Sequence, residues 1–153
     1  MSEKISNYLA MTVTMAVENV ISGTGGPFAA IVVKNGEIIG KGTNTVTHDN
    51  DPSAHAEVNA IRNACKHLES YQLDDCEIYS SCEPCPMCLG AIYWARPERL
   101  VYVTSKHDAA DAGFDDAFIY EEIELPIAQR HLQTAYCPEE PFTLPFRLWK
   151  ESE

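Results

Sequence analysis

Residues 76–105 read CEIYSSCEPCPMCLGAIYWARPERLVYVTS, a stretch in which two strand-like segments flank a helical one. Residues 76–81 and 99–105 predict two short strands. Pro86 stands where a helix can begin, so the residues between the two strands predict a helix that starts there. A strand, a helix and a second strand in this order form a parallel, right-handed crossover. The stretch therefore predicts an α/β domain with parallel strands.

The residues before this stretch add a helix and an antiparallel pair of strands. Apolar side chains recur at helical spacing over residues 3–21, which predicts an amphipathic helix. Residues 28–34 and 37–43 predict two strands, and Asn35-Gly36 between them is the strongest short signal for a β-hairpin. The hairpin therefore contributes an antiparallel pair to a sheet whose later strands run parallel.

The rest of the chain adds one clear helix and a weaker C-terminal region. A helix is predicted over residues 54–68, after a polar loop at residues 45–53. Residues 108–118 predict a loop with helical pieces, residues 119–125 fit either a helix or a strand, and the tail ends in a short helix. The whole order predicts a three-layer α/β/α fold with a mixed central sheet, in a single domain over residues 1–153.

The composition is that of a soluble globular protein with an acidic surface. The chain has 153 residues, 45% of them hydrophobic, and no apolar run approaches the roughly 20 residues that a membrane span needs. The N-terminal residues lack the pattern of a signal peptide, so we expect a cytoplasmic protein. With 11 basic and 23 acidic residues the net charge is −12, which disfavours nucleic acid as a partner.

The chain holds six cysteines, and three of them lie at intervals of three residues: Cys82, Cys85 and Cys88. In a reducing compartment, cysteines set this close together are more often metal ligands or catalytic groups than disulfides. An iron–sulfur cluster of the bacterial ferredoxin type needs a fourth cysteine soon after Cys88, and the sequence supplies none. A redox dithiol stays open, although it would leave His55 and Glu57 without a role.

Cys85 and Cys88 lie where they can chelate one metal ion. With Pro86 at the first helical position, Cys85 lies at the N-terminus of the predicted helix and Cys88 lies one turn further on. The helix dipole and the free backbone N–H groups there lower thiol pKa values. His55 adds an imidazole, and one nitrogen with two thiolates suits zinc. Three protein ligands leave a position for water, as in catalytic zinc sites, whereas Cys82 as a fourth ligand would make the site structural.

Glu57 stands two residues after His55 and is the candidate catalytic acid and base. On a helical wheel Glu57 falls within the apolar arc of the 54–68 helix, where a carboxylate is costly unless it is paired, bonded or neutral. A solvated place in a frayed first turn stays the alternative. His55 falls almost opposite Glu57, so both can serve one site only if the helix end points into it. Together the residues form H-x-E followed by P-C-x-x-C, the signature of zinc-dependent deaminases.

With these motifs the chain resembles the cytidine and nucleobase deaminase superfamily, and within it the bacterial guanine deaminases. The resemblance implies a cytidine-deaminase-like fold and hydrolytic deamination of guanine to xanthine and ammonia, through a zinc-activated water with Glu57 as proton shuttle. It also implies a homodimer whose C-terminal segments, about residues 138–153, are exchanged between subunits. The stretches that carry the resemblance are GGPFAAIVVKNG, DPSAHAEVNAIRNACK, YQLDDC, SCEPCPMCLGAIYWARP and DAADAGFDDAFIYEEI.

The resemblance also implies residues that bind the substrate, a purine base. It implies that Asn44 and Asp116 read the base. It implies Phe28 and Trp94 in the lining of the pocket, and Ala56 as a further substrate contact. Taken without the family, Asn44 is equally a turn residue, an acid in a loop such as Asp116 is usually solvated, and both aromatic residues fit a core.

Other functions stay open at this point. A tRNA adenosine deaminase shares the zinc motif but needs a basic face for RNA. Deamination of cytosine, guanosine, a pterin or ammeline requires only small changes around Asn44 and Asp116, and Asp115 competes with Asp116 for the base contact. A structural zinc module that binds a partner protein would use the motif without a reaction. The chain ends in LWKESE, so it lacks the C-terminal aromatic residue that the resemblance implies for closing the site, and Trp149 is its last aromatic residue.

Overall fold

The computed structural model describes residues 3–114, 116–138 and 143–152. The chain divides into two units, Met1–Ile119 and Tyr120–Glu153. The first unit holds the sheet and the cysteine and histidine motifs. Among the described residues, no helix combines the length and the apolar character that crossing a lipid bilayer requires.

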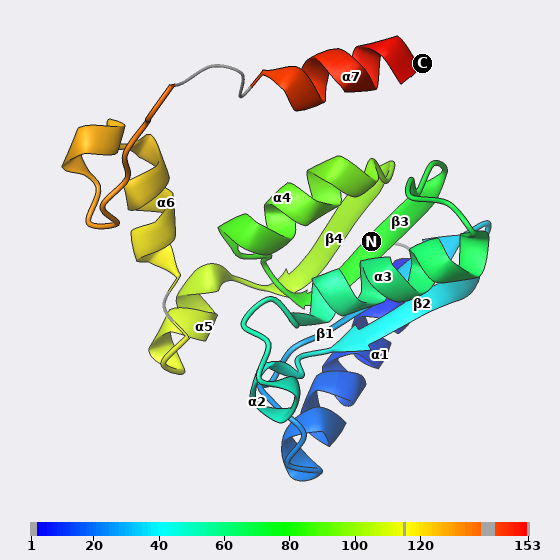
Figure 1. Ribbon diagram of the computed structural model, residues 1–153. Coiled ribbons are helices and arrows are strands. Elements are labelled where there is room, and N and C mark those ends of the chain that lie inside the picture. The colour runs from blue at the N-terminus through cyan, green and yellow to red at the C-terminus, as the bar shows by residue number, and fades with distance from the viewer. Residues whose placement is uncertain (1–2, 115, 139–142, 153) are drawn as a thin grey trace. The chain divides into compact units, whose positions relative to one another are not determined.

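In the described part of the chain, a four-stranded sheet forms the centre of the first unit (Figure 1). Its strands are β1 (Ala29–Lys34), β2 (Glu37–Thr43), β3 (Cys76–Cys82) and β4 (Arg99–Thr104), in the spatial order β2-β1-β3-β4. β1 runs antiparallel to both of its neighbours, while β3 and β4 are parallel. These pairings confirm the predicted hairpin and the predicted mixed sheet. They also confirm that the two strands joined by the predicted helix after Cys85 are parallel.

Helices cover both faces of this sheet and complete the three layers that the sequence predicts. α1 (Glu3–Ile21) packs on one face, against β1 and β3. α3 (Ala56–Leu68) and α4 (Pro86–Ala95) lie on the other face, where α3 packs against β2 and β1 (Figure 1). The two helices that carry the zinc motif therefore lie side by side on one face of the sheet.

Smaller helices occupy the regions where the sequence pattern is weak. α2 (Val46–Asp49) lies inside the predicted polar loop, and a single turn that ends at Asn50 has no apolar periodicity to detect. α5 (Lys106–Asp111) begins with a capping box between Ser105 and Asp108. Further along the chain follow α6 (Ala117–Glu124), the 3-10 helix η1 (Ile127–Gln129) and α7 (Leu144–Ser152). The segment that fits either a helix or a strand belongs to α6, a helix.

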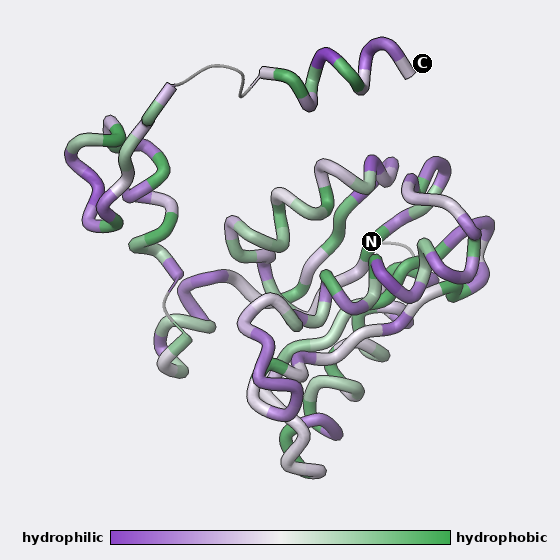
Figure 2. Tube along the Cα trace, viewed as in Figure 1, coloured by the Kyte–Doolittle hydropathy of each residue, from purple (hydrophilic) through white to green (hydrophobic). Residues whose placement is uncertain are grey.

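β1 is buried on both faces and forms the centre of the core. Figure 2 shows hydrophobic residues along this strand. Its side chains alternate between the two helix layers. Ala30 and Val32 pack with residues of α3 and α4, whereas Ile31 and Val33 pack with residues of α1. Because both faces of β1 are covered, its sequence is a continuous apolar run without alternation.

Glycines on β2 let α3 approach the sheet closely. A Cβ atom added to Gly42 would lie 2.2 Å from the backbone oxygen of Ala56 and 2.4 Å from the backbone nitrogen of Ala60. A Cβ atom added to Gly40 would lie 2.7 Å from the Cβ atom of Ala64. These distances are shorter than van der Waals contact, so only glycine fits without a shift. The close approach sets the N-terminal end of α3 against the end of β2, where the candidate site residues lie.

We expect Gly42→Ala to lower the free energy of unfolding by about 1–3 kcal/mol, because the added methyl group overpacks the contact between β2 and α3. Gly90→Ala is the matched control, since Gly90 lies inside α4 with open space around the added Cβ atom. There the same substitution should raise the free energy of unfolding by about 0.5–1 kcal/mol, because alanine favours a helix. Urea unfolding of both variants measures the two effects. Free energies of unfolding that shift in the same direction in both variants would contradict the close approach of α3 to β2.

Candidate active site

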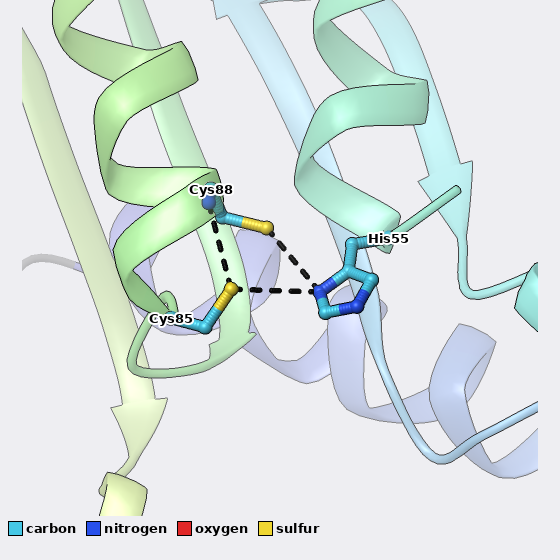
Figure 3. A group of neighbouring side chains, drawn as sticks. All are labelled: His55, Cys85 and Cys88. Carbon is cyan, nitrogen blue, oxygen red and sulfur yellow. Dashed lines mark hydrogen bonds between the residues drawn. The ribbon is translucent and has the colours of Figure 1, made fainter. Parts of the chain in front are cut away.

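The structure brings His55, Cys85 and Cys88 together from two helix N-termini. His55 is the residue directly before the first turn of α3, and Cys85 holds the same position in α4. Figure 3 shows the imidazole of His55 facing both sulfur atoms. The Nδ1 atom of His55 lies 3.6 Å from Cys85 Sγ and 3.5 Å from Cys88 Sγ. The end of α3 does point into the site, so His55 and Glu57 can serve it together.

This group fits a tetrahedral zinc ion. Its nitrogen and two sulfur atoms all lie within 4.8 Å of one another. Zinc–sulfur bonds of about 2.3 Å and zinc–nitrogen bonds of about 2.0 Å place the nitrogen and a sulfur of a tetrahedral site roughly 3.5 Å apart. The two separations from His55 Nδ1 agree with this value. The donor atoms are therefore spaced for zinc by the fold itself.

The electrostatics of the two thiols also favour a bound cation. Hydrogen bonds from Cys88 and His55 lower the pKa of Cys85 to about 4, which holds this sulfur as the thiolate that binds metals. Hydrogen bonding to Cys85 and burial raise the pKa of Cys88. A bound cation would compensate the charge of a second thiolate, so metal binding here would release a proton.

Cys82, the third cysteine of the motif, stands apart from this group. Its Sγ atom donates a hydrogen bond to the backbone oxygen of Ser105 at 3.5 Å. Among the described residues, the cluster that could hold a metal consists of His55, Cys85 and Cys88 without Cys82. Three protein ligands are typical of catalytic zinc sites, whereas a fourth cysteine would be typical of a structural site.

Glu57 is buried beside the metal-binding group. It lies in the first turn of α3 and is 5% exposed, so the prediction that it falls on the buried face of this helix is confirmed. Burial raises the pKa of its carboxyl group. Ser80, at the end of β3, donates a hydrogen bond from Oγ to Glu57 Oε1 at 3.0 Å. The solvated alternative is excluded, and the carboxyl group is held in place by a buried partner.

A cavity of about 390 Å³ opens beside these residues in the first unit. Its size is in the range of small-molecule sites. Its lining includes His55 and Cys85, which could hold a metal, and the carboxyl group of Glu57. Three residues expected to bind the substrate also line it: Phe28, Asn44 and Asp116. Groups that are far apart in the sequence therefore converge on one space.

Other expected residues lie away from this cavity. Trp94 is 81% exposed and does not line the cavity, because it lies in the last turn of α4, away from the end that carries Cys85. The structure therefore does not bring Trp94 into the pocket of its own chain. Ala56, the first residue of α3, is fully buried in the core and does not line the cavity either. Asp115 lies outside the described residues, so its competition with Asp116 stays open.

Sequence reasoning missed Ser80, Glu83 and Phe114. Phe114 lines the cavity, and its ring centroid lies 5.0 Å from that of Phe28 in an edge-to-face arrangement of 87°. Glu83 also lines the cavity and accepts a hydrogen bond from the backbone N–H of Lys106 at 3.1 Å. Each missed residue lies within or next to a motif that the sequence singles out, and this proximity was the available signal.

Comparisons with known proteins agree with this geometry. A family model described as the cytidine and deoxycytidylate deaminase zinc-binding region matches residues 2–104. Guanine deaminase of Bacillus subtilis (strain 168) is 55% identical, over 94% of this chain and 92% of its own. tRNA-specific adenosine deaminase of Aquifex aeolicus (strain VF5) is 35% identical, over 73% of this chain and 72% of its own.

Solved structures show the same likeness. The X-ray structure of the Bacillus subtilis guanine deaminase has a TM-score of 0.94 and 53% identity, covering 99% of this chain and 95% of that one. A mutant of the protein NE0047 in complex with 8-azaguanine has a TM-score of 0.68 and 33% identity, covering 71% of this chain and 63% of that one. The chain therefore belongs to the cytidine and deoxycytidylate deaminase family, with a bacterial guanine deaminase as its relative over nearly its whole length.

Proposed function

We propose that this protein catalyses the hydrolytic deamination of guanine to xanthine and ammonia. The observation that carries the proposal is the cavity, which holds the buried carboxyl group of Glu57 beside His55 and Cys85 and is also lined by Asn44 and Asp116. The likeness to a guanine deaminase supports guanine as the substrate. The 8-azaguanine complex of a structural relative supports a purine base in the cavity.

In this proposal His55, Cys85 and Cys88 hold a zinc ion. When bound, zinc lowers the pKa of a coordinated water to about 7, which makes hydroxide available at neutral pH. The two cysteines and the histidine supply the thiolate and imidazole ligands that zinc prefers. The proton transfers and the recognition of the base fall to other side chains of the cavity.

Glu57 moves the protons in the proposed reaction. Its carboxylate takes a proton from the attacking water and delivers it to a ring nitrogen, which makes the amino-bearing carbon more electrophilic. The water oxygen bonds to that carbon, and Glu57 then passes the proton of the new hydroxyl group to the amine. The carbon–nitrogen bond breaks, so ammonia leaves and xanthine remains. The hydrogen bond from Ser80 Oγ to Oε1 holds the carboxyl group of Glu57 in place for these transfers.

Base recognition in this proposal uses a carboxylate, an amide and aromatic rings. Guanine presents several N–H donors, and the carboxylate of Asp116 can accept from them. Asn44 reads another polar edge of the base with its carboxamide. Phe28 and Phe114, which line the cavity together, pack against the planar ring. The carboxylate of Asp116 and the carboxamide of Asn44 together favour a purine base that has hydrogen-bond donors and acceptors on different edges.

We further propose a cytoplasmic homodimer that exchanges C-terminal segments of about residues 138–153, with a purine base and water as its small-molecule partners. Three large apolar side chains of α7 are exposed in the single chain: Phe146, Leu148 and Trp149. Apolar side chains gathered in this way mark a surface that another chain covers. The net charge of −12 supports a protein without nucleic-acid or membrane partners, since both partners carry negative surfaces.

A substrate panel tests the proposed function. Ammonia release by the zinc-loaded protein is measured with guanine, guanosine, cytosine, a pterin, ammeline and a tRNA. We expect kcat/KM for guanine to exceed that for each other substrate by about 100-fold or more, because unpaired polar groups in the cavity penalise the wrong base.

Turnover of another base with guanine untouched would contradict the assignment of Asn44 and Asp116. Salt-dependent deamination of tRNA would favour the activity of the tRNA-specific relative. Zinc binding without any turnover would favour a structural zinc module.

A further inference from the structure

The carboxamide of Asn44 has a fixed orientation in the cavity wall. Its Oδ1 atom accepts hydrogen bonds from the backbone N–H of Gly26 at 3.4 Å and of Val46 at 3.3 Å. An amide oxygen has two lone pairs, so these two donors use its acceptor capacity. No described residue accepts a hydrogen bond from Asn44 Nδ2. Asn44 is 8% exposed and lines the cavity, so Nδ2 is the polar atom left to face the ligand, as a donor.

Asn19 of α1 joins the two chain segments that hold this carboxamide. It is 6% exposed, and its Nδ2 atom donates to the backbone oxygen of Asn44 and to that of Gly26, both at 2.9 Å. Gly26 is therefore tied to Asn44 twice, directly through its N–H group and indirectly through Asn19. A Cβ atom added to Gly25 would lie 2.0 Å from the backbone oxygen of Asn44, so the two segments are already in the closest contact.

Asn59 of α3 holds Asn44 from the other side. Its Nδ2 atom donates to the backbone oxygen of Thr43 at 3.0 Å and to Thr45 Oγ1 at 3.1 Å. Thr43 and Thr45 are the two chain neighbours of Asn44. Helices from opposite faces of the sheet therefore anchor the same short segment, one at Asn44 itself and one at its flanks.

We propose that Asn19 and Asn59 are positioning residues that fix the Asn44 carboxamide as a hydrogen-bond donor toward the base. The inference rests on the proposed function and deepens it. It assigns Asn44 to an acceptor on guanine, such as O6 or N7, and leaves the N–H donors of guanine to the carboxylate of Asp116. Specificity then depends on two asparagines, the buried Asn19 and the half-buried Asn59, that do not line the cavity.

Three variants of the full chain, each loaded with zinc, test this proposal. Asn59→Ala removes one anchor. Asn63→Ala is its matched control, because Asn63 lies one turn further along α3 and its Nδ2 also donates to a backbone oxygen of β2, that of Lys41, at 2.8 Å. Asn63 bonds neither neighbour of Asn44. Asn19→Ser removes the other anchor but keeps a hydroxyl group and room for a water molecule beside the two backbone oxygens, which protects the fold.

The readout is the choice between guanine and two analogues. The sulfur of 6-thioguanine is a weaker acceptor than O6, and 7-deazaguanine lacks the N7 acceptor. The wild-type protein should prefer guanine over at least one analogue by about tenfold in kcat/KM, the size of one hydrogen bond. The preference should fall to about twofold in Asn59→Ala and Asn19→Ser, with KM rising more than kcat falls, and should persist in Asn63→Ala.

An unchanged preference in Asn59→Ala and Asn19→Ser would overturn the inference, even if activity or melting temperature falls, because a structural role alone does not change which acceptor is read. Equal use of guanine and both analogues by the wild-type protein would overturn it as well. Failure of the proposed function shows differently: the wild-type protein would not turn over guanine at all, and the inference would fall with it.

Discussion

Glu57→Gln should lower kcat for guanine by about 10²–10⁴-fold while the protein keeps its zinc. Glutamine has nearly the same volume as glutamate, and its amide oxygen can still accept the hydrogen bond that Ser80 Oγ donates to Glu57 Oε1 at 3.0 Å. The substitution removes the proton acceptor and leaves the packing of α3 in place. Ammonia release and zinc content per chain measure the two effects separately.

Glu77→Gln is the matched control for this experiment. Glu77 lies near the start of β3, at the opposite end of the strand from Ser80, and accepts a hydrogen bond from Arg99. This variant loses the same charge and should keep kcat near that of the wild type. Near-normal turnover by Glu57→Gln would refute its assignment as acid and base. Loss of zinc from Glu57→Gln would mean that the carboxylate supports the metal-binding group instead.

Cys85→Ala should lose zinc and guanine turnover together, whereas Cys82→Ala should keep the zinc. Mutation of a residue that only supports a zinc ligand weakens metal affinity about 10–100-fold. Removal of a ligand itself should weaken the affinity further. Cys85 Sγ lies 3.6 Å from His55 Nδ1, while Cys82 Sγ bonds the backbone of Ser105. The two cysteines lie three residues apart in the same motif, which makes the pair of variants a close comparison.

Melting temperature supplies a readout of metal binding that does not depend on activity. A ligand that binds the folded state raises the melting temperature, and the shift grows with the logarithm of the ligand concentration divided by Kd. Added zinc should therefore stabilise the wild-type protein and Cys82→Ala, and a chelator should reverse the effect. Added zinc should leave the melting temperature of Cys85→Ala nearly unchanged. The reverse pattern, with zinc retained by Cys85→Ala and lost by Cys82→Ala, would contradict the proposed ligand set.

Short-range patterns were enough to predict most of the sheet and its two main helix layers. Asn35-Gly36 lies in the turn between β1 and β2, and Pro86 begins α4, because a tight turn and a helix start depend on the conformations of one or two residues. The burial of Glu57 followed from the helical wheel for the same reason, since a helix period is local.

The cavity could be predicted only where a motif marks it. Asn19 and Asn59 carry no local signal, because their partners lie on other elements of the fold. Phe114 reaches Phe28 only through the folded chain. An aromatic residue such as Trp94 suits the lining of a pocket, but its position on α4 leaves the side chain exposed to solvent. Contacts between distant segments depend on how helices pack on the sheet, and a single sequence does not encode this packing as a local pattern.

The source of the oxygen atom in the product tests whether this cavity hydrolyses guanine. The zinc-loaded wild-type protein is incubated with guanine in water enriched in oxygen-18, and the product is examined by mass spectrometry while ammonia is counted. Hydrolysis predicts xanthine that carries one oxygen-18 atom, with one ammonia released for each xanthine. Unlabelled product, product without ammonia, or no consumption of guanine by the zinc-loaded protein would contradict it.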